Sequence, residues 1–180
     1  IQGQQDSPLS PAGQQMATDW GRRLASFSWQ RIICSDLGRT RETTELINKT
    51  LKLPVHPDKR LREQNWGEWS GISLTEVKKT HKKLLQSMVR SGWLFQPPGG
   101  ESREQVLKRS LAALYEAHTT WPGESILVVC HEGVIKCLLY HLTKRKFLPE
   151  EPKLLKPRHL HLLAQDDSTL YLKEINCMQL

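Results

Sequence analysis

The sequence predicts an α/β protein, a three-layer α/β/α sandwich in which helices cover both faces of a largely parallel, mixed sheet. Segments with strand and helix patterns alternate along the chain. Short apolar runs such as 31–35 and 125–130 are typical of strands buried on both faces. No internal repeat interrupts the 180 residues, so we expect a single domain over residues 1–180.

The first half of the chain predicts helix, strand and helix in turn. Ser10 followed by Pro11 favours a helix start, because Ser accepts free N–H groups and Pro suits the first helical position. Apolar residues then recur at helical spacing as far as Phe27. A strand is expected over 31–35 and a second helix over 39–51.

Two capping-box patterns predict the next helices, at 73–76 and at 102–105. After the first, one apolar face is expected, formed by Leu74, Val77, Leu84, Leu85 and Met88. A strand over 125–130 and a helix over 134–142 follow, and three prolines mark an irregular connection. Two late strands, 159–164 and 170–175, are expected to flank a turn at Asp166-Asp167-Ser168.

The net charge of +7 fits nucleic acid, anionic lipid or a phosphorylated small molecule as partner. No apolar run approaches the roughly 20 residues of a membrane helix, and no signal peptide opens the chain. No nucleic-acid-binding fingerprint is present. The four scattered cysteines include no C-x-x-C pair, which excludes a zinc ribbon and indicates reduced thiols in the cytoplasm.

Three loops carry the residues suited to chemistry. Arg39 and His131 each follow a predicted strand and precede a helix, where open α/β sheets bind anions. Glu63 lies in the polar segment 61–71, beside two tryptophans. A guanidinium, an imidazole and a carboxylic acid suit phosphoryl transfer. The alternatives are a polar rim histidine, a surface arginine ion pair and a solvated loop acid.

Five motifs in order resemble those of the histidine phosphatase superfamily, the phosphoglycerate mutase-like family. Residues 1–15 resemble the segment after the phosphorylated histidine, and Ser35-Asp36-Leu37 with Arg39 resembles the second arginine motif. Leu61-x-Glu63 with Trp66-Gly67-x-Trp69-x-Gly71 resembles the acid loop. The segment 98–102 resembles a loop of the phosphatase members, and His131-x-Gly133 resembles the second histidine.

The resemblance implies a metal-independent phosphatase that works through a phosphohistidine and needs no cofactor. The family's nucleophile lies in an Arg-His-Gly triplet at the end of its first strand, and no such triplet occurs here. Because the first residue is Ile1 and not Met, we expect a preceding piece with that strand to be missing, and these 180 residues alone to be inactive.

The resemblance also assigns roles to particular residues. Arg39 and His131 would hold the phosphate oxygens, and Glu63 would protonate the leaving group. A buried Trp66 or Trp69 beside the acid would raise its pKa. Further contacts to the phosphate are implied for Gln2, Gly3, Ser35, the backbone of Glu132, and Gly133.

The compact segment between Glu63 and His131 and the short tail ending at Leu180 favour a phosphatase over a mutase. The expected partner is a small phosphorylated metabolite, with no nucleic acid and no membrane, and a homodimer is left open. Phosphoglycerate mutase-type transfer remains an alternative. A non-catalytic pseudophosphatase or basic ligand-binding module is the alternative from another class.

Overall fold

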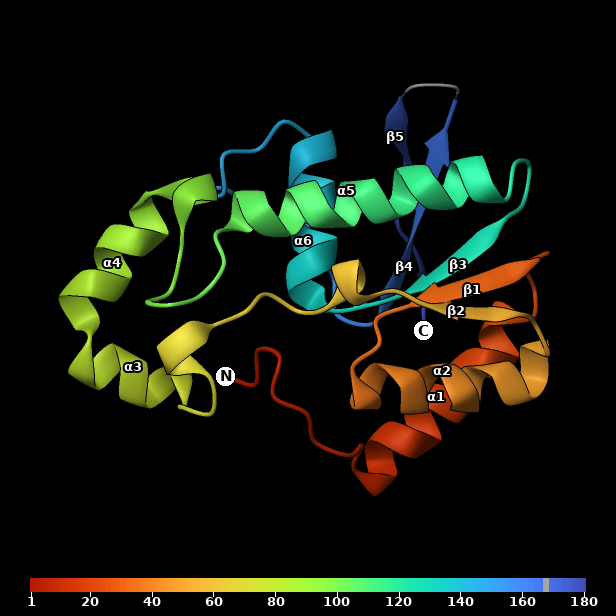
Figure 1. Ribbon diagram of the computed structural model, residues 1–180, viewed down its shortest axis with the longest axis horizontal. Helices are drawn as coiled ribbons and strands as arrows, with labels where there is room; N and C mark the ends of the chain where they lie inside the picture. The colour runs from red at the N-terminus through yellow and green to blue at the C-terminus, as the bar shows by residue number, and fades with distance from the viewer. Residues whose placement is uncertain (167–168) are drawn as a thin grey trace.

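The computed structural model describes residues 1–166 and 169–180 (Figure 1). Three parallel strands form a sheet in the order β2-β1-β3, with Ile33 opposite His56 on one side and Val128 on the other. The strands are β1 (Arg31–Cys34), β2 (Val55–Pro57), β3 (Ile126–Val129), β4 (His159–Gln165) and β5 (Leu170–Gln179). The α-helices are α1 (Pro11–Leu24), α2 (Gly38–Leu51), α3 (Leu74–Thr80), α4 (Lys82–Arg90), α5 (Arg103–Thr120) and α6 (Glu132–Leu142). Short 3-10 helices are η1 (Lys59–Leu61), η2 (Gly67–Trp69) and η3 (Gly92–Leu94).

Helices cover both faces of the parallel sheet, which confirms the predicted three-layer α/β class. Ile32 and Ile33 point to opposite faces of β1, and both are almost completely buried. On the first face, Ile32 packs with Leu24 and Ile47 from α1 and α2. On the second, Ile33 packs in a larger cluster with residues of α5 and α6. Figure 1 shows these helix pairs on opposite sides of the strands.

The antiparallel strands do not join the parallel sheet directly. β4 and β5 pair only with each other among the described residues and form a two-stranded sheet of their own. Within the described part of the chain, the expected mixed sheet is therefore divided into a parallel sheet and a hairpin. β5 extends to Gln179, four residues past its predicted end. Asp167 and Ser168 of the predicted turn lie outside the described residues.

The region after Ser73 differs from its expected single apolar face. The Ser73 hydroxyl accepts from the Glu76 N–H, as predicted, but the helix ends at Thr80 and a second one begins at Lys82. Val77, Leu85 and Met88 pack in one cluster across the break at His81, as members of the expected face. Leu74 and Leu84 are 47% and 42% exposed, which corrects their assignment to that face.

β2 was not expected from the sequence. It is three residues long, contains a proline and has exposed side chains throughout, so no apolar pattern marks it. Its backbone is nevertheless fixed because it pairs with the buried strand β1. No helix among the described residues is long and apolar enough to cross a membrane.

Candidate active site

A pocket opens where the parallel neighbours β1 and β3 end and where α2 and α6 begin. Helix N-termini carry main-chain N–H groups without intrahelical partners, so this end of the sheet suits an anion. The pocket has a volume of about 410 Å³. Its lining comes from the N-terminal loop, α2, the acid loop and the start of α6: Ile1, Gln2, Gly3, Arg39, Glu63, Trp66, Cys130, His131 and Glu132.

Arg39 is anchored by the main chain of the N-terminal loop. Its Nη1 donates to the Gln5 carbonyl and its Nη2 to the Gly3 carbonyl, each at 2.8 Å. Asp6 accepts the N–H groups of Gly38 and Arg39 at the start of α2, and its carboxylate lies 3.6 Å from Arg39 Nη1. A guanidinium has five donors, so Arg39 keeps donors for an anion in the pocket.

His131 is the residue that precedes α6, and its ring is held between hydroxyls and a guanidinium. Nε2 lies 2.9 Å from Ser35 Oγ and 3.1 Å from Thr40 Oγ1, whereas Nδ1 lies 3.4 Å from Arg39 Nη2. Burial, followed by the positive charges of Arg39 and Arg109, lowers the pKa of His131 to about 3. The ring is therefore neutral at pH 7. Because a guanidinium only donates, we assign Nδ1 as the acceptor and Nε2 as the protonated atom.

Glu63 is the half-buried acid of the pocket. Its Oε1 accepts from the Gln64 N–H at 2.7 Å and its Oε2 from the Gly133 N–H at 3.3 Å. Burial raises the pKa of Glu63 above its ordinary value, although these N–H groups and the charge of Arg39 act in the opposite direction. A carboxyl with a raised pKa is suited to give a proton to a leaving oxygen.

Two glycines are required by close approach. A Cβ on Gly133 would overlap Glu63 Oε1, so only glycine lets the acid reach the N-terminus of α6. Gly3 has a φ of +54°, a left-handed conformation in which its carbonyl faces Arg39, and an added Cβ would meet Ser70 Oγ at 3.0 Å. Both glycines thus position the catalytic candidates through their backbones.

The structure separates the remaining predicted contacts into two groups. Gln2 and Glu132 line the pocket, and the Glu132 side chain turns outward to pair with Lys136 at 2.6 Å. An acid at this position therefore leaves the pocket free of its charge. Ser35 is fully buried behind His131 and does not line the pocket. We interpret it as a residue that orients the imidazole.

Four further residues support the site, although the sequence did not indicate them as site residues. Asp6 and Thr40 hold Arg39 and His131, as described above. Arg109 on α5 donates to the Glu63 carbonyl at 3.1 Å and forms an ion pair with Glu101 at 2.9 Å. Glu101 in turn accepts from the main chain of the acid loop. No local pattern marks these contacts, because they join segments far apart in the sequence.

Cys130 also lines the pocket, and its thiol is a candidate nucleophile. Burial raises the pKa of its thiol to about 12, which keeps it protonated and unreactive at pH 7. Within residues 1–166 and 169–180, no group of three or more His, Cys, Asp or Glu side chains is arranged to hold a metal ion. The polar groups available in the pocket are therefore those of a guanidinium, a neutral imidazole and a half-buried acid.

An α/β sandwich whose strand ends present a guanidinium, an imidazole and an acid has the groups that suit phosphoryl transfer. The profile of the histidine phosphatase superfamily (branch 1) matches residues 1–177. This chain belongs to the histidine phosphatase superfamily.

Relatives with known structures share the fold. Bacillus stearothermophilus YhfR superposes with a TM-score of 0.86 at 28% identity, covering 97% of this chain and 87% of that one. A mycobacterial glucosyl-3-phosphoglycerate phosphatase superposes with a TM-score of 0.84 at 26% identity, covering 98% of this chain and 91% of that one.

A curated relative in Salmonella choleraesuis (strain SC-B67) is named "Probable phosphoglycerate mutase GpmB". It is 39% identical over 142 residues, which make up 77% of this chain. The match spans 65% of that relative's length.

Proposed function

We propose that this protein hydrolyses phosphate monoesters through a phosphohistidine intermediate. The observation that carries the proposal is the meeting of Arg39, His131 and the half-buried Glu63 in one pocket at the strand ends. Family membership supports the reaction class, and the names of relatives include both phosphatases and a mutase. Activity is proposed for the protein in which an Arg-His-Gly strand accompanies these residues, because the triplet does not occur within residues 1–180.

The residues present divide the work of binding and proton transfer. Arg39, with the Glu132 N–H at the start of α6, neutralises the phosphate oxygens. His131 contributes its Nδ1, which lies beside Arg39 Nη2 at 3.4 Å. A bound dianion favours the protonated imidazole, so His131 takes up a proton as the phosphate enters and then donates to it.

In the in-line attack, a ring nitrogen of the histidine in the Arg-His-Gly triplet forms a bond to phosphorus, and the bond from phosphorus to the ester oxygen breaks. Glu63 gives its proton to that oxygen, so the alcohol leaves neutral. The resulting carboxylate then accepts a proton from the water that attacks the phosphohistidine, which releases phosphate and restores both groups. The half-buried position of Glu63 and its raised pKa support this acid–base role.

The substrate class we propose is a small phosphorylated metabolite, and we favour hydrolysis over mutase-type transfer because the segment between the acid loop and α6 is compact. Phosphoglycerate distinguishes the two reactions: a phosphatase releases inorganic phosphate, whereas a mutase interconverts the isomers.

Cytoplasmic location also stays a prediction, supported by the four cysteines being free. A homodimer remains open and is tested by light scattering.

The Glu63→Gln change tests the proposal in the protein that carries the triplet. Glutamine has no proton to donate to an oxyanion leaving group, so hydrolysis of an alkyl phosphate is expected to fall by roughly 10²-fold or more. Hydrolysis of p-nitrophenyl phosphate is expected to fall much less, because nitrophenolate leaves without a proton. Steady-state kinetics on both esters measures the difference.

Glu68→Gln is the matched control, since Glu68 is an exposed acid on the same loop. It should leave both rates unchanged. Equal losses on the two esters after Glu63→Gln would contradict the acid role, and turnover by residues 1–180 alone would contradict the need for the histidine triplet.

A further inference from the structure

Glu132 places an acidic side chain at the rim of the pocket that we propose binds a phosphate dianion. It lines this pocket, and it is the first residue of α6, directly after His131. Among the described residues, Glu63 is the only other acid in the lining. Because like charges repel, a Glu132 carboxylate turned into the pocket would oppose phosphate binding.

Lys136 holds the Glu132 carboxylate on the outer surface of α6. Glu132 Oε1 lies 2.6 Å from Lys136 Nζ, and the two side chains are 73% and 42% exposed. Residues four apart in an α-helix share a face, and an acid that precedes a lysine by four residues is the favourable order. Within the described part of the chain, Glu132 forms an ion pair with no other residue.

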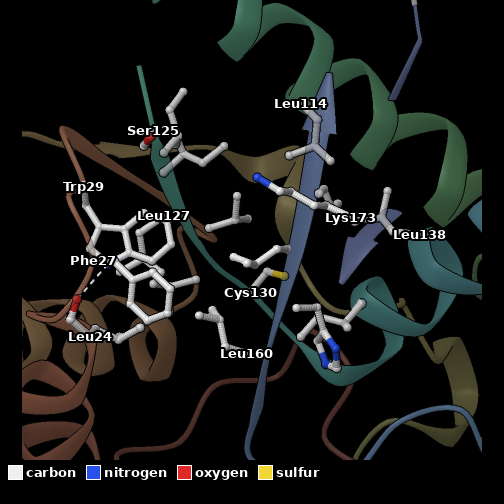
Figure 2. Close-up of a pocket in the computed structure, with 18 of the residues that line it drawn as sticks. Leu24, Phe27, Trp29, Leu114, Ser125, Leu127, Cys130, Leu138, Leu160 and Lys173 are labelled. Carbon is white, nitrogen blue, oxygen red and sulfur yellow. Dashed lines mark hydrogen bonds between the residues drawn. The ribbon is translucent and has the colours of Figure 1, made fainter. Parts of the chain in front are cut away.

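The backbone of α6 is fixed by packing, so the position of the Glu132 carboxylate depends on its side-chain rotamer. Val134, Cys137 and Leu138 are buried members of the helix. Figure 2 shows Leu138 beside an apolar cavity that Leu114 of α5 also lines. The helix cannot turn to carry Glu132 away from the pocket, and the Lys136 contact is what selects the outward rotamer.

Arg39 is the other group that would attract this carboxylate. It is the only permanently charged cationic side chain among the described residues of the lining, and it keeps donors for an anion. Its Nη2 lies 3.4 Å from the Nδ1 of His131, the residue next to Glu132. The N-terminus of α6 also favours negative charge. A Glu132 carboxylate released from its partner would therefore compete with phosphate for the same groups.

We infer that Lys136 is a positioning residue of the phosphate site, which acts by keeping the Glu132 carboxylate out of the pocket. Lys136 does not itself line the pocket. It neutralises the acid and holds it on the outer face of α6, so that the main-chain N–H of Glu132 faces an anion without the charge of its own side chain. This inference rests on the proposed function, since it concerns the same phosphate site.

The affinity of the 180-residue chain for inorganic phosphate tests the inference. In Lys136→Met, the dissociation constant measured by calorimetry at low ionic strength should rise by roughly threefold to fivefold, the scale of an interaction between partly exposed charges. Lys136→Arg keeps a cation on the same face and should bind phosphate as the parent does. Lys49→Met is the matched control, because it removes an exposed lysine from the last turn of α2.

A double-mutant cycle separates an action through Glu132 from direct attraction between Lys136 and phosphate. Glu132→Gln leaves no carboxylate to be held, so adding Lys136→Met to it should change the dissociation constant by less than about 1.5-fold. Direct attraction would instead give the same loss in both backgrounds.

Steady-state kinetics of the protein that carries the Arg-His-Gly triplet gives a second measurement. Lys136→Met should raise KM for p-nitrophenyl phosphate by a similar factor and leave kcat unchanged, because the ion pair affects binding of the dianion and not the chemical step. A merely structural role of Lys136 would lower kcat as well.

Two results would overturn the inference and leave the proposed function intact. They are a dissociation constant in Lys136→Met that equals the parent value, and an equal loss in the presence and absence of the Glu132 carboxylate. If the parent chain showed no saturable binding of phosphate, the phosphate site itself would be contradicted and the inference with it.

Discussion

At the scale of single residues, the candidate site depends on two titratable groups, His131 and Glu63, whose pKa values are shifted in opposite directions. His131 is kept neutral by burial and by the nearby guanidinium groups of Arg39 and Arg109, whereas burial keeps the proton on Glu63 to a higher pH than usual. A phosphate dianion reverses the first effect, because its charge favours imidazolium. Substrate binding and proton uptake are therefore coupled at His131.

His131 predicts a particular dependence of stability on pH. Its pKa is about 3 when folded and near 6.5 when unfolded, so the unfolded chain binds more protons between these values. The contribution of His131 to the free energy of unfolding should be complete above pH 6.5. It should decrease below that pH by up to about 1.4 kcal/mol per pH unit. Urea unfolding of the parent and of His131→Asn between pH 4.5 and 7.5 measures this, and the variant should lose that slope. Parallel pH profiles would contradict the neutral assignment.

Gly133 predicts a steric effect on the acid. In Gly133→Ala, the methyl group overlaps Glu63 Oε1 and forces the carboxyl out of its seat at the start of α6. Because the displaced group is the end of a flexible side chain, we expect the loss in the free energy of unfolding to stay below the roughly 1–3 kcal/mol of overpacked cores. Hydrolysis of an alkyl phosphate by the protein that carries the triplet should fall, because the acid is displaced. Gly13→Ala is the control, because a Cβ there meets only Leu9 and Ser10 just before α1, at ordinary contact distances. An unchanged rate on the alkyl phosphate in Gly133→Ala would contradict a role of this contact in positioning Glu63.

At the scale of elements, the acid loop is attached to α5 through Arg109, which also pairs with Glu101. Arg109 donates to the carbonyls of Arg60 and Glu63, and Glu101 accepts from the Asn65 N–H. The loop has little regular structure of its own beyond η1 and η2. The position of the Glu63 carboxyl therefore depends on a helix that begins forty residues further along the chain.

Arg109→Ala should loosen this attachment. The change leaves Glu101 without its cation and the Arg60 carbonyl without its donor, whereas the Glu63 carbonyl keeps the Gln4 side chain as donor. The free energy of unfolding should therefore fall by about 2–3 kcal/mol. Hydrogen exchange in residues 60–66 should speed up more than in the sheet. Lys108→Ala removes an exposed cation from the same helix and serves as the control. Equal exchange rates in the two variants would contradict the role of Arg109.

Periodicity and strand ends predicted most elements, since the buried strands and capped helices carry strong local patterns. These patterns failed where the position of an element or a residue depends on tertiary contacts. β2 has no apolar pattern, and the break at His81 has no proline or glycine to mark it. Asp6 and Arg109 lie 33 and 46 residues from the site residues they hold, Arg39 and Glu63, so no local spacing indicates them.

At the scale of the whole molecule, the anion pocket lies at the ends of β1 and β3, which are neighbours in the parallel sheet. Arg39 and His131 were predictable because parallel strands bring their carboxyl ends together. Glu63 was placed in the site only by the family resemblance, since nothing in a polar loop indicates burial. The division into a parallel sheet and a separate hairpin among the described residues could not be predicted from periodicity, because strand patterns do not say which edges pair.

The central claim is that Arg39 and His131 form a phosphate site, and the ¹⁵N NMR signals of the His131 ring test it most directly. Titrating the chain with inorganic phosphate at pH 7 should convert these signals from neutral imidazole to imidazolium as the site fills. Arg39→Gln should abolish that conversion, whereas Arg41→Gln, which removes an exposed cation from the same helix, should preserve it. A ring that stays neutral at saturating phosphate, or a conversion that survives Arg39→Gln, would contradict the account.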